Sequence, residues 1–164
     1  MSSISIEIAG PPELVFRLAH DPLRWPALLP HYTRARPISR QPDGSVVAAY
    51  VARREIVPIV GLGIPVAWRS RSWADPDTCR LRFRHLGGAT DGMDVIWRIE
   101  PAGGGSRVTI DHVFRPRMPG WAFLVDRLVV RPIATRTLST FKVLAEALAG
   151  AGESSTGPLT KIKS

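Results

Sequence analysis

Cysteine, lysine and long hydrophobic runs are all scarce in this chain of 164 residues. The single cysteine, Cys79, cannot form an internal disulfide, and no apolar run is long enough to span a bilayer. The first residues lack the basic and apolar regions of a secretory signal. We therefore expect a cytoplasmic protein in a reducing environment.

Motifs for metals and cofactors are absent from the sequence as well. No spacing of histidine, cysteine and aspartate resembles a metal site. The glycines near Gly61 lack the spacing of a dinucleotide-binding loop, and there is no Gly-x-Ser-x-Gly nucleophile elbow. We expect a protein that works with its own side chains, without a metal or a cofactor.

What the chain does contain is the composition of one folded domain. Hydrophobic residues make up 45% and charged residues 22%, which excludes a disordered chain. At this length we expect residues 1–149 to form a single domain and residues 150–164 to form a disordered tail. The net charge of +8, mostly from arginine, favours an acidic partner.

Hydrophobic alternation and turn residues predict the order of the elements. A strand at 3–8 is followed by short helices at 13–19 and 23–29. A long helix covers 119–148 and ends before Gly150. Between them, short turns predict an antiparallel meander of strands at 32–40, 45–55, 66–74, 78–85, 91–100 and 107–115. The prediction is an α+β fold, with a curved antiparallel sheet of about seven strands wrapped around the C-terminal helix.

Two apolar stretches suggest a gate. The first half of the long helix, 121–130, is apolar around nearly its whole circumference and needs cover on more than one side. Segment 56–66 carries no charge and is either a buried strand with an irregular turn or, as we prefer, an apolar flap over a pocket mouth. We expect Val125 and Leu62 to meet a ligand there, with Pro132 letting the helix bend.

The alternation also indicates which side chains of the strands face the helix. They are Trp68, Ser70, Ser72, Leu81, Phe83, His85, Met93, Val95, Trp97, Ile99, Val108, Ile110, His112 and Phe114. Counting through the hairpins places His85 and His112 two strands apart and about four residues out of register, which is on the order of 15 Å. At that distance they would contact different parts of one long ligand.

Several motifs resemble the START-like helix-grip superfamily, and most of all its single-domain polyketide aromatase/cyclases. The first is the run Ala9-Gly10-Pro11-Pro12-Glu13-Leu14-Val15 at the first helix. The others are Asp21…Trp25-Pro26…Tyr32, Trp68-Arg69-Ser70, Asp75-Pro76-Asp77 and Met93-Asp94-Val95-Ile96-Trp97. The likeness extends over most of residues 3–148. It implies the helix-grip fold.

The resemblance also implies a function. In the family, a poly-β-ketone chain on an acyl carrier protein is folded in an elongated pocket, closed by aldol chemistry and dehydrated. On that resemblance the pocket would be lined by Trp25, Tyr32, Trp68, Ser70, Met93 and Trp97. To these we add Phe83, which the alternation turns inward, and Val125 at the expected gate. A prominent family arginine aligns with Ser72, and the adjacent Arg71 could replace it only if a β-bulge turned it inward.

Each candidate has a plainer interpretation. The three tryptophans are either ligand contacts or ordinary core residues. Tyr32 either supplies a hydroxyl donor to the pocket or keeps its hydroxyl in water. An inward histidine could move protons during enolisation or dehydration, or could be a satisfied core residue. We prefer the core interpretation for His85 and leave both open for His112.

Two functions follow from these alternatives. The first is an enzyme, a polyketide cyclase/dehydratase in which Tyr32, Ser70 and His112 are catalytic. The second is a non-catalytic carrier for an apolar ligand such as a quinone, a lipid or a polyketide. The outward arginines Arg80, Arg82 and Arg84 are either solvated surface or a docking site for an acidic acyl carrier protein. Nucleic acid is disfavoured, because no exposed aromatic platform accompanies the charge. Whether the protein forms a homodimer is left open by the sequence.

Overall fold

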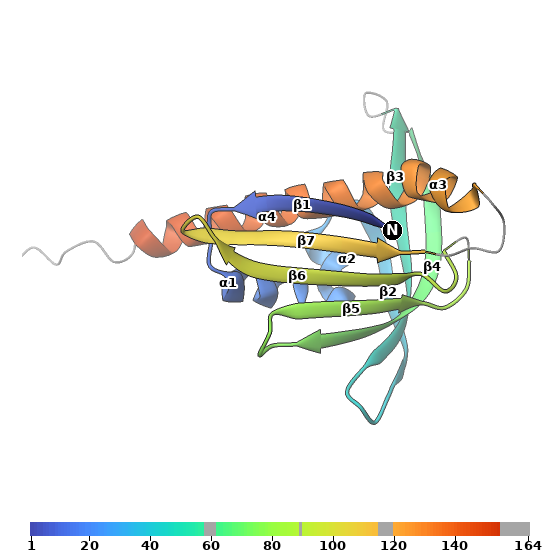
Figure 1. Ribbon diagram of the computed structural model, residues 1–164, viewed down its shortest axis with the longest axis horizontal. Coiled ribbons are helices and arrows are strands. Elements are labelled where there is room, and N and C mark those ends of the chain that lie inside the picture. The colour runs from blue at the N-terminus through green and yellow to red at the C-terminus, as the bar shows by residue number, and fades with distance from the viewer. Residues whose placement is uncertain (58–61, 89, 115–119, 155–164) are drawn as a thin grey trace, which may run out of the picture.

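The computed structural model, in which residues 1–57, 62–88, 90–114 and 120–154 are described, is a curved sheet packed against one long helix (Figure 1). The chain runs β1 (Ser2–Ile8), α1 (Pro12–Ala19), η1 (Pro22–Arg24), α2 (Trp25–Leu28), β2 (Tyr32–Arg40), β3 (Val46–Val57), β4 (Leu62–Asp75), β5 (Arg80–His85), β6 (Asp94–Ala102), β7 (Gly105–Val113), α3 (Trp121–Val125), η3 (Asp126–Val130) and α4 (Arg131–Ser154). The predicted α+β helix-grip fold is confirmed.

The sheet has seven strands in the order β1-β7-β6-β5-β4-β3-β2, and all neighbours are antiparallel. Only the β1–β7 pairing joins strands that are distant in sequence. It depends on a close approach at Gly105, where a Cβ atom would lie 2.2 Å from the carbonyl oxygen of Ile8. Glycine is therefore required at this position, and the first strand closes the sheet around the helix.

The short helices begin where prolines and a cap allow it. Pro12 occupies the first turn of α1, where a missing N–H leaves no hydrogen bond unmade. Asp21 precedes Pro22, and its carboxylate accepts the backbone N–H of Leu23 at 3.1 Å. These caps hold Trp25 at the start of α2, pointing into the space between the sheet and the long helix.

The second half of the long helix packs as an amphipathic helix should. Leu138, Phe141 and Ala145 are fully buried against the concave face of the sheet, where Trp97 and Ile110 lie. The helix runs to Ser154, so the prediction that it ends before Gly150 is wrong. No helix within the described residues is long and apolar enough to cross a bilayer.

The first half of the long helix departs from the prediction. Val125 and Val130 are buried, but Phe123, Leu124 and Leu128 are 70%, 46% and 43% exposed. The described part of the chain buries one stripe of this half, so the expected cover on a second side is not found among the described residues.

A wide π turn, η3, separates α3 from α4. The N–H of Arg131 donates to the carbonyl of Asp126, five residues back. Pro132 follows immediately and has no N–H for the carbonyl of Leu128, so the α-helical ladder is interrupted there. The irregularity expected at Pro132 is present as this turn.

The apolar segment 56–66 continues the β3–β4 hairpin. β4 begins at Leu62 and passes through Pro65, which pairs with Arg53, and Ile64 is 53% exposed, so this part of the segment is a strand but not a buried one. Residues 58–61 lie outside the described residues, so the predicted flap over the pocket is not tested at its tip. Within the described part, Val66 faces the long helix across a cavity.

Candidate functional site

A cavity of about 90 Å³ lies between the concave face of the sheet and the junction of η3 with α4. Strands β2 to β7, α2 and the helix all contribute to its wall. The wall contains Trp25, Tyr32, Tyr50, Val66, Trp68, Ser70, Phe83, His85, Thr90, Met93, Val95, Trp97, Ile110, His112, Val129, Val130, Ile133, Ala134 and Thr137. None of these side chains is an acid, a lysine or an arginine. The inner chamber, as we call this cavity, therefore suits a neutral ligand.

Aromatic rings make up most of one wall. Trp68 is stacked between Tyr50 and His85, with ring centroids 5.7 and 5.9 Å apart and interplanar angles of 24° and 11°. Trp25 packs edge-on to Tyr32 at 5.1 Å, and its indole N–H donates to the carbonyl of Ala19 at 3.1 Å. Cross-strand neighbours on one face of the sheet bring the three stacked rings together. The result is a flat surface suited to a planar ligand.

Three side chains of the wall carry a buried polar atom without a hydrogen-bond partner in the described structure. The atoms are Tyr50 Oη, Ser70 Oγ and His112 Nδ1. Buried polar groups in native proteins nearly always have a partner, so unpaired ones in a cavity wall suggest that a ligand or water supplies it. Ser70 lies directly opposite His85 on the neighbouring strand.

The hydroxyls of Tyr50, Ser70 and Ser72 converge. Burial raises the pKa of Tyr50 to about 12, and the nearby hydroxyls of Ser72 and Ser70 oppose the shift. Neither Tyr50 nor Ser70 reaches hydrogen-bond geometry, whereas Ser72 donates to the carbonyl of Val46 at 3.2 Å. Two free hydroxyls therefore lie close together at the wall of the inner chamber.

His31, Tyr32 and Thr137 form a second cluster of polar side chains, at the start of β2 and on α4. Thr137 donates its hydroxyl proton to the carbonyl of Ile133 at 2.8 Å, so its oxygen accepts from His31 Nε2, also at 2.8 Å. Burial raises the pKa of Tyr32 well above its usual range, and an interaction of its hydroxyl with Thr137 opposes the rise. Tyr32 thus keeps its proton at neutral pH and is a hydrogen-bond donor.

The two inward histidines of the sheet lie closer together than predicted. The N–H of His85 donates to the carbonyl of Met93, and His112 pairs with Val95, so the two are offset by two residues along β6. The predicted offset of four residues is wrong, because the turn after His85 uses more residues than a tight hairpin. Both histidines line the inner chamber.

Burial keeps these histidines neutral. The pKa of His112 is lowered to about 4 by burial, with Asp126 and Asp111 acting in the opposite direction and Arg131 adding to the shift. The pKa of His85 is lowered to about 3 by burial and by the charge of His112. His85 Nδ1 is 2.7 Å from the hydroxyl of Thr90. At neutral pH both imidazoles in the wall of the chamber are therefore uncharged.

A second cavity, the outer chamber, adjoins the first. It measures about 250 Å³ and lies where the N-terminus of β1 and the end of β7 meet α3 and η3 (Figure 1). Its wall contains Met1, Ser2, Met93, His112, Phe114, Phe123, Asp126 and Val130. Three of these, Met93, His112 and Val130, also line the inner chamber. They form the partition between the two spaces.

Eight of the predicted site residues line the inner chamber: Trp25, Tyr32, Trp68, Ser70, Phe83, Met93, Trp97 and His112. Val125 does not line either chamber; it is 3% exposed and packs in the core. Ser72 lies just outside the inner chamber and lines a separate hollow beside η1.

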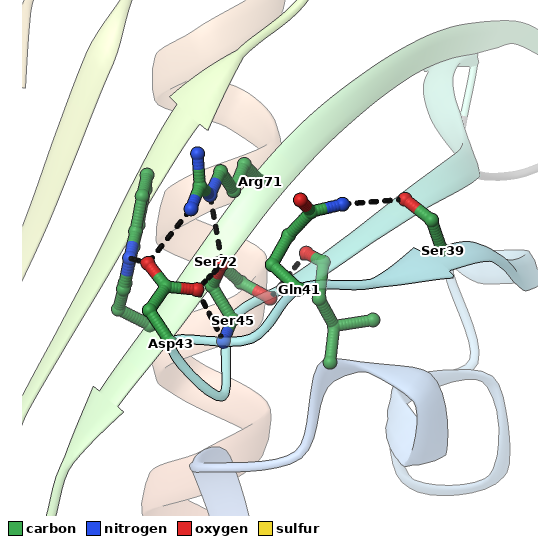
Figure 2. Close-up of polar contacts among 8 residues, drawn as sticks. Ser39, Gln41, Asp43, Ser45, Arg71 and Ser72 are labelled. Carbon is green, nitrogen blue, oxygen red and sulfur yellow. Dashed lines mark hydrogen bonds and ion pairs between the residues drawn. The ribbon is translucent and has the colours of Figure 1, made fainter.

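The structure places Arg71 on the outer face of the sheet (Figure 2). Its guanidinium donates to Ser45 Oγ and to the carboxylate of Asp43, both at 2.7 Å, and lies 4.9 Å from the centre of the Trp73 ring. No bulge interrupts the pairing of β4 with its neighbours at this position, so nothing turns the side chain inward. The role of Arg71 in this structure is to fasten the β2–β3 hairpin to β4.

Several chamber residues were not predicted. Tyr50 lies in the sequence Val46–Val51, where apolar residues follow one another and the inward face cannot be assigned by alternation. Thr137 lies on the long helix, and no motif in the sequence marks it as part of a cavity wall. Residues spaced at i and i+4 from Val129 to Thr137 were the signal available for the helix side of the wall.

Comparison with known proteins identifies the class that this fold and cavity define. A family described as polyketide cyclase / dehydrase and lipid transport matches residues 2–146, so the chain belongs to that family. A Streptomyces cyaneus protein, named provisionally as a polyketide cyclase, is 29% identical over 117 residues, which is 70% of this chain and 73% of that protein.

Solved structures share the fold. The Zhui aromatase/cyclase from Streptomyces sp. R1128 is 17% identical with a TM-score of 0.72, covering 88% of this chain and 92% of its own. A START superfamily protein from Mycobacterium smegmatis is 17% identical with a TM-score of 0.64, covering 90% and 97%. Identities this low establish the architecture alone.

Proposed function

We propose that this protein is a polyketide cyclase/dehydratase that holds a poly-β-ketone chain between the sheet and the long helix and directs ring closure and dehydration. The observation that carries the proposal is the set of unpaired polar atoms of Tyr50, Ser70 and His112 in an otherwise apolar, aromatic wall. A storage site needs only apolar cover, whereas the neighbouring hydroxyls of Tyr50 and Ser70, with Ser70 opposite the neutral His85, are groups that carbonyl chemistry uses.

Each step of the reaction can be given to a side chain of this wall. Neutral His112 accepts a proton from the carbon between two carbonyls, and the resulting enol carbon forms a bond to a second carbonyl carbon. The hydroxyls of Ser70 and Tyr50 hydrogen-bond to that carbonyl oxygen, which takes up a proton to become a hydroxyl. Loss of a neighbouring proton together with the hydroxyl then releases water.

Tyr32 and the stacked rings would act by positioning. Tyr32 stays protonated at neutral pH and can donate to a further carbonyl of the chain. The flat surface of Tyr50, Trp68 and His85 favours the planar product. Holding a flexible chain in one reactive arrangement accounts for much of the rate advantage available to such an enzyme.

An acidic acyl carrier protein is the partner we propose for the outer sheet face. Arg80, Arg82 and Arg84 are exposed on β5. Asp94 forms ion pairs with Arg82 and Arg84, Arg98 forms one with Asp111, and Asp75 lies opposite Arg80 on β4, so the four arginines exceed the three carboxylates by one charge. A net positive stripe of this kind suits the acidic surface of a carrier protein.

The test is a reconstitution in which the protein is added to a carrier-bound poly-β-ketone and the ring regiochemistry of the products is compared with and without it. We expect a changed product ratio that His112→Gln and Ser70→Ala each reduce, while Val143→Ala, on the exposed face of α4, leaves it unchanged. An unchanged product spectrum, together with co-purification of an intact lipid or quinone, would instead establish the carrier function.

A further inference from the structure

We propose that the outer chamber is the second half of the ligand site, and that the ligand is a neutral, flat molecule of about three fused rings or an equally long folded chain that passes between Met93, His112 and Val130. The inference deepens the proposed function by naming the size and chemistry of the ligand. Its test uses binding alone, so it can fail or succeed independently of catalysis.

The first argument is volume. At about 90 Å³, the inner chamber is smaller than the cavity of about 150 Å³ that holds one benzene ring. The outer chamber adds about 250 Å³. Only the two together reach the lower end of the range of roughly 300–1,000 Å³ that is typical of small-molecule sites.

The second argument is the nature of the partition. Met93 is unbranched and has three rotatable side-chain bonds, so it can move aside without a change in the backbone. It follows Gly92, whose φ of +76° lets the chain turn sharply into β6. Val130 is the last residue of the π turn, where the helix ladder is already interrupted. A partition built from these residues can open at small cost.

The third argument is the polarity of the two halves. The inner chamber has no charged side chain, whereas the wall of the outer chamber includes Asp126. That carboxylate is held in place by the hydroxyl of Ser2 and by the Nε–H of Arg131 at 3.0 Å. Because its charge is already balanced by Arg131, the outer chamber suits hydroxyl and carbonyl groups better than a cationic group.

His112 lies between the inner and the outer chamber. A ligand that occupies both chambers would therefore place its middle part beside His112. Its Nδ1 is buried and has no partner within the described residues, and the His112 side chain lines both chambers. A hydroxyl or an enolisable position near the middle of the ligand would lie beside this side chain. The ligand would therefore react, or be recognised, at its centre and not at its end.

The test follows amide and indole signals by NMR while the ¹⁵N-labelled protein is titrated with 1,8-dihydroxyanthraquinone, a neutral three-ring probe, and separately with phenol. We expect the three-ring probe to shift the indole N–H of Trp97 and the amides of Phe123 and Asp126 with one common Kd. Phenol is too large for the inner chamber alone and too small to span both chambers, so it should not shift the two groups of signals together. A three-ring probe that shifts only one of the two groups would overturn the proposal.

Two variants distinguish an effect on the partition between the chambers from a general loss of stability. Val130→Phe narrows the passage at the partition. It should raise the Kd of the three-ring probe by about tenfold or more and change the Kd of phenol by about twofold at most. Val143→Phe, the matched control on the exposed face of α4, should change neither. If Val130→Phe perturbs the fold, Met93→Ala provides the opposite test, since a wider junction should tighten binding of the three-ring probe.

The outcomes distinguish this inference from the proposed function. Binding across both chambers without any change in polyketide products would support the two-chamber site in a carrier protein. Changed products with a probe confined to the inner chamber would support the enzyme and reject the two-chamber site.

Discussion

The buried histidines should make the stability of this protein fall steeply between pH 7.5 and pH 5.5. His31 and His112 are 2% and 5% exposed, and the pKa of each is lowered to about 4, mainly by burial. In the unfolded chain each would titrate near the ordinary value of about 6.5. The unfolded state therefore binds protons first as the pH falls, and stability that is fully present above pH 6.5 is lost progressively down to about pH 4.

The magnitude follows from linkage. At pH 5.5 each of these histidines lowers the free energy of unfolding by about 1.4 kcal/mol relative to pH 7.5, so the pair lowers it by about 3 kcal/mol. A domain of this kind is stable by only about 5–15 kcal/mol in total, so the effect is large. Carboxylates contribute little in this range, because in the unfolded chain they titrate near pH 4. His85, whose pKa burial lowers to about 3, should add a loss of similar size.

The assay is urea unfolding at the two pH values, followed by tryptophan fluorescence. His112→Gln removes one of the groups while keeping a similar volume, so the difference between the two pH values should shrink by about 1.4 kcal/mol. His20→Gln, at an exposed ring, is the matched control and should leave the difference unchanged. A wild-type difference below about 1 kcal/mol, or an equal difference in His112→Gln, would refute the burial argument.

Three further predictions follow from the contacts described. Asp126→Asn should lower the pKa of His112 further, since the Asp126 charge raises it; the imidazole signals in a pH titration measure this, and an unchanged pKa would contradict it. Arg71→Gln should lower the thermal midpoint, because it unfastens Asp43 from β4, yet leave binding of 1,8-dihydroxyanthraquinone within about twofold; a larger loss would place Arg71 at the ligand. Val125→Asp should unfold the protein, because it leaves an unpaired charge in the core; a folded variant in circular dichroism with weakened ligand uptake would restore Val125 to the gate.

The fold could be predicted because its strands alternate and its turns are marked by Gly, Pro and Asp. The same alternation placed Trp68, Phe83, Trp97 and His112 on the inner face, where the structure has them. It failed at Tyr50, because the surrounding strand is apolar on both faces.

The rest of the site depends on geometry that the sequence does not carry. The register of His85 with respect to His112 is set by the glycines of the turn between β5 and β6, three of which have positive φ. The two chambers and their partition depend on where large side chains meet across the fold. The periodicity of the sequence does not indicate which side chains meet across the fold.

The hydrogen bond between Ser2 and Asp126 has a practical consequence for work with this protein. It ties the second residue of the chain to the helical turn beside the outer chamber, and the N-terminus lies at that end of the molecule (Figure 1). An affinity tag or fusion partner joined ahead of Met1 would therefore stand at the mouth of the ligand site and could itself occupy it. The far end of α4 lies at the opposite end of the molecule, away from the outer chamber.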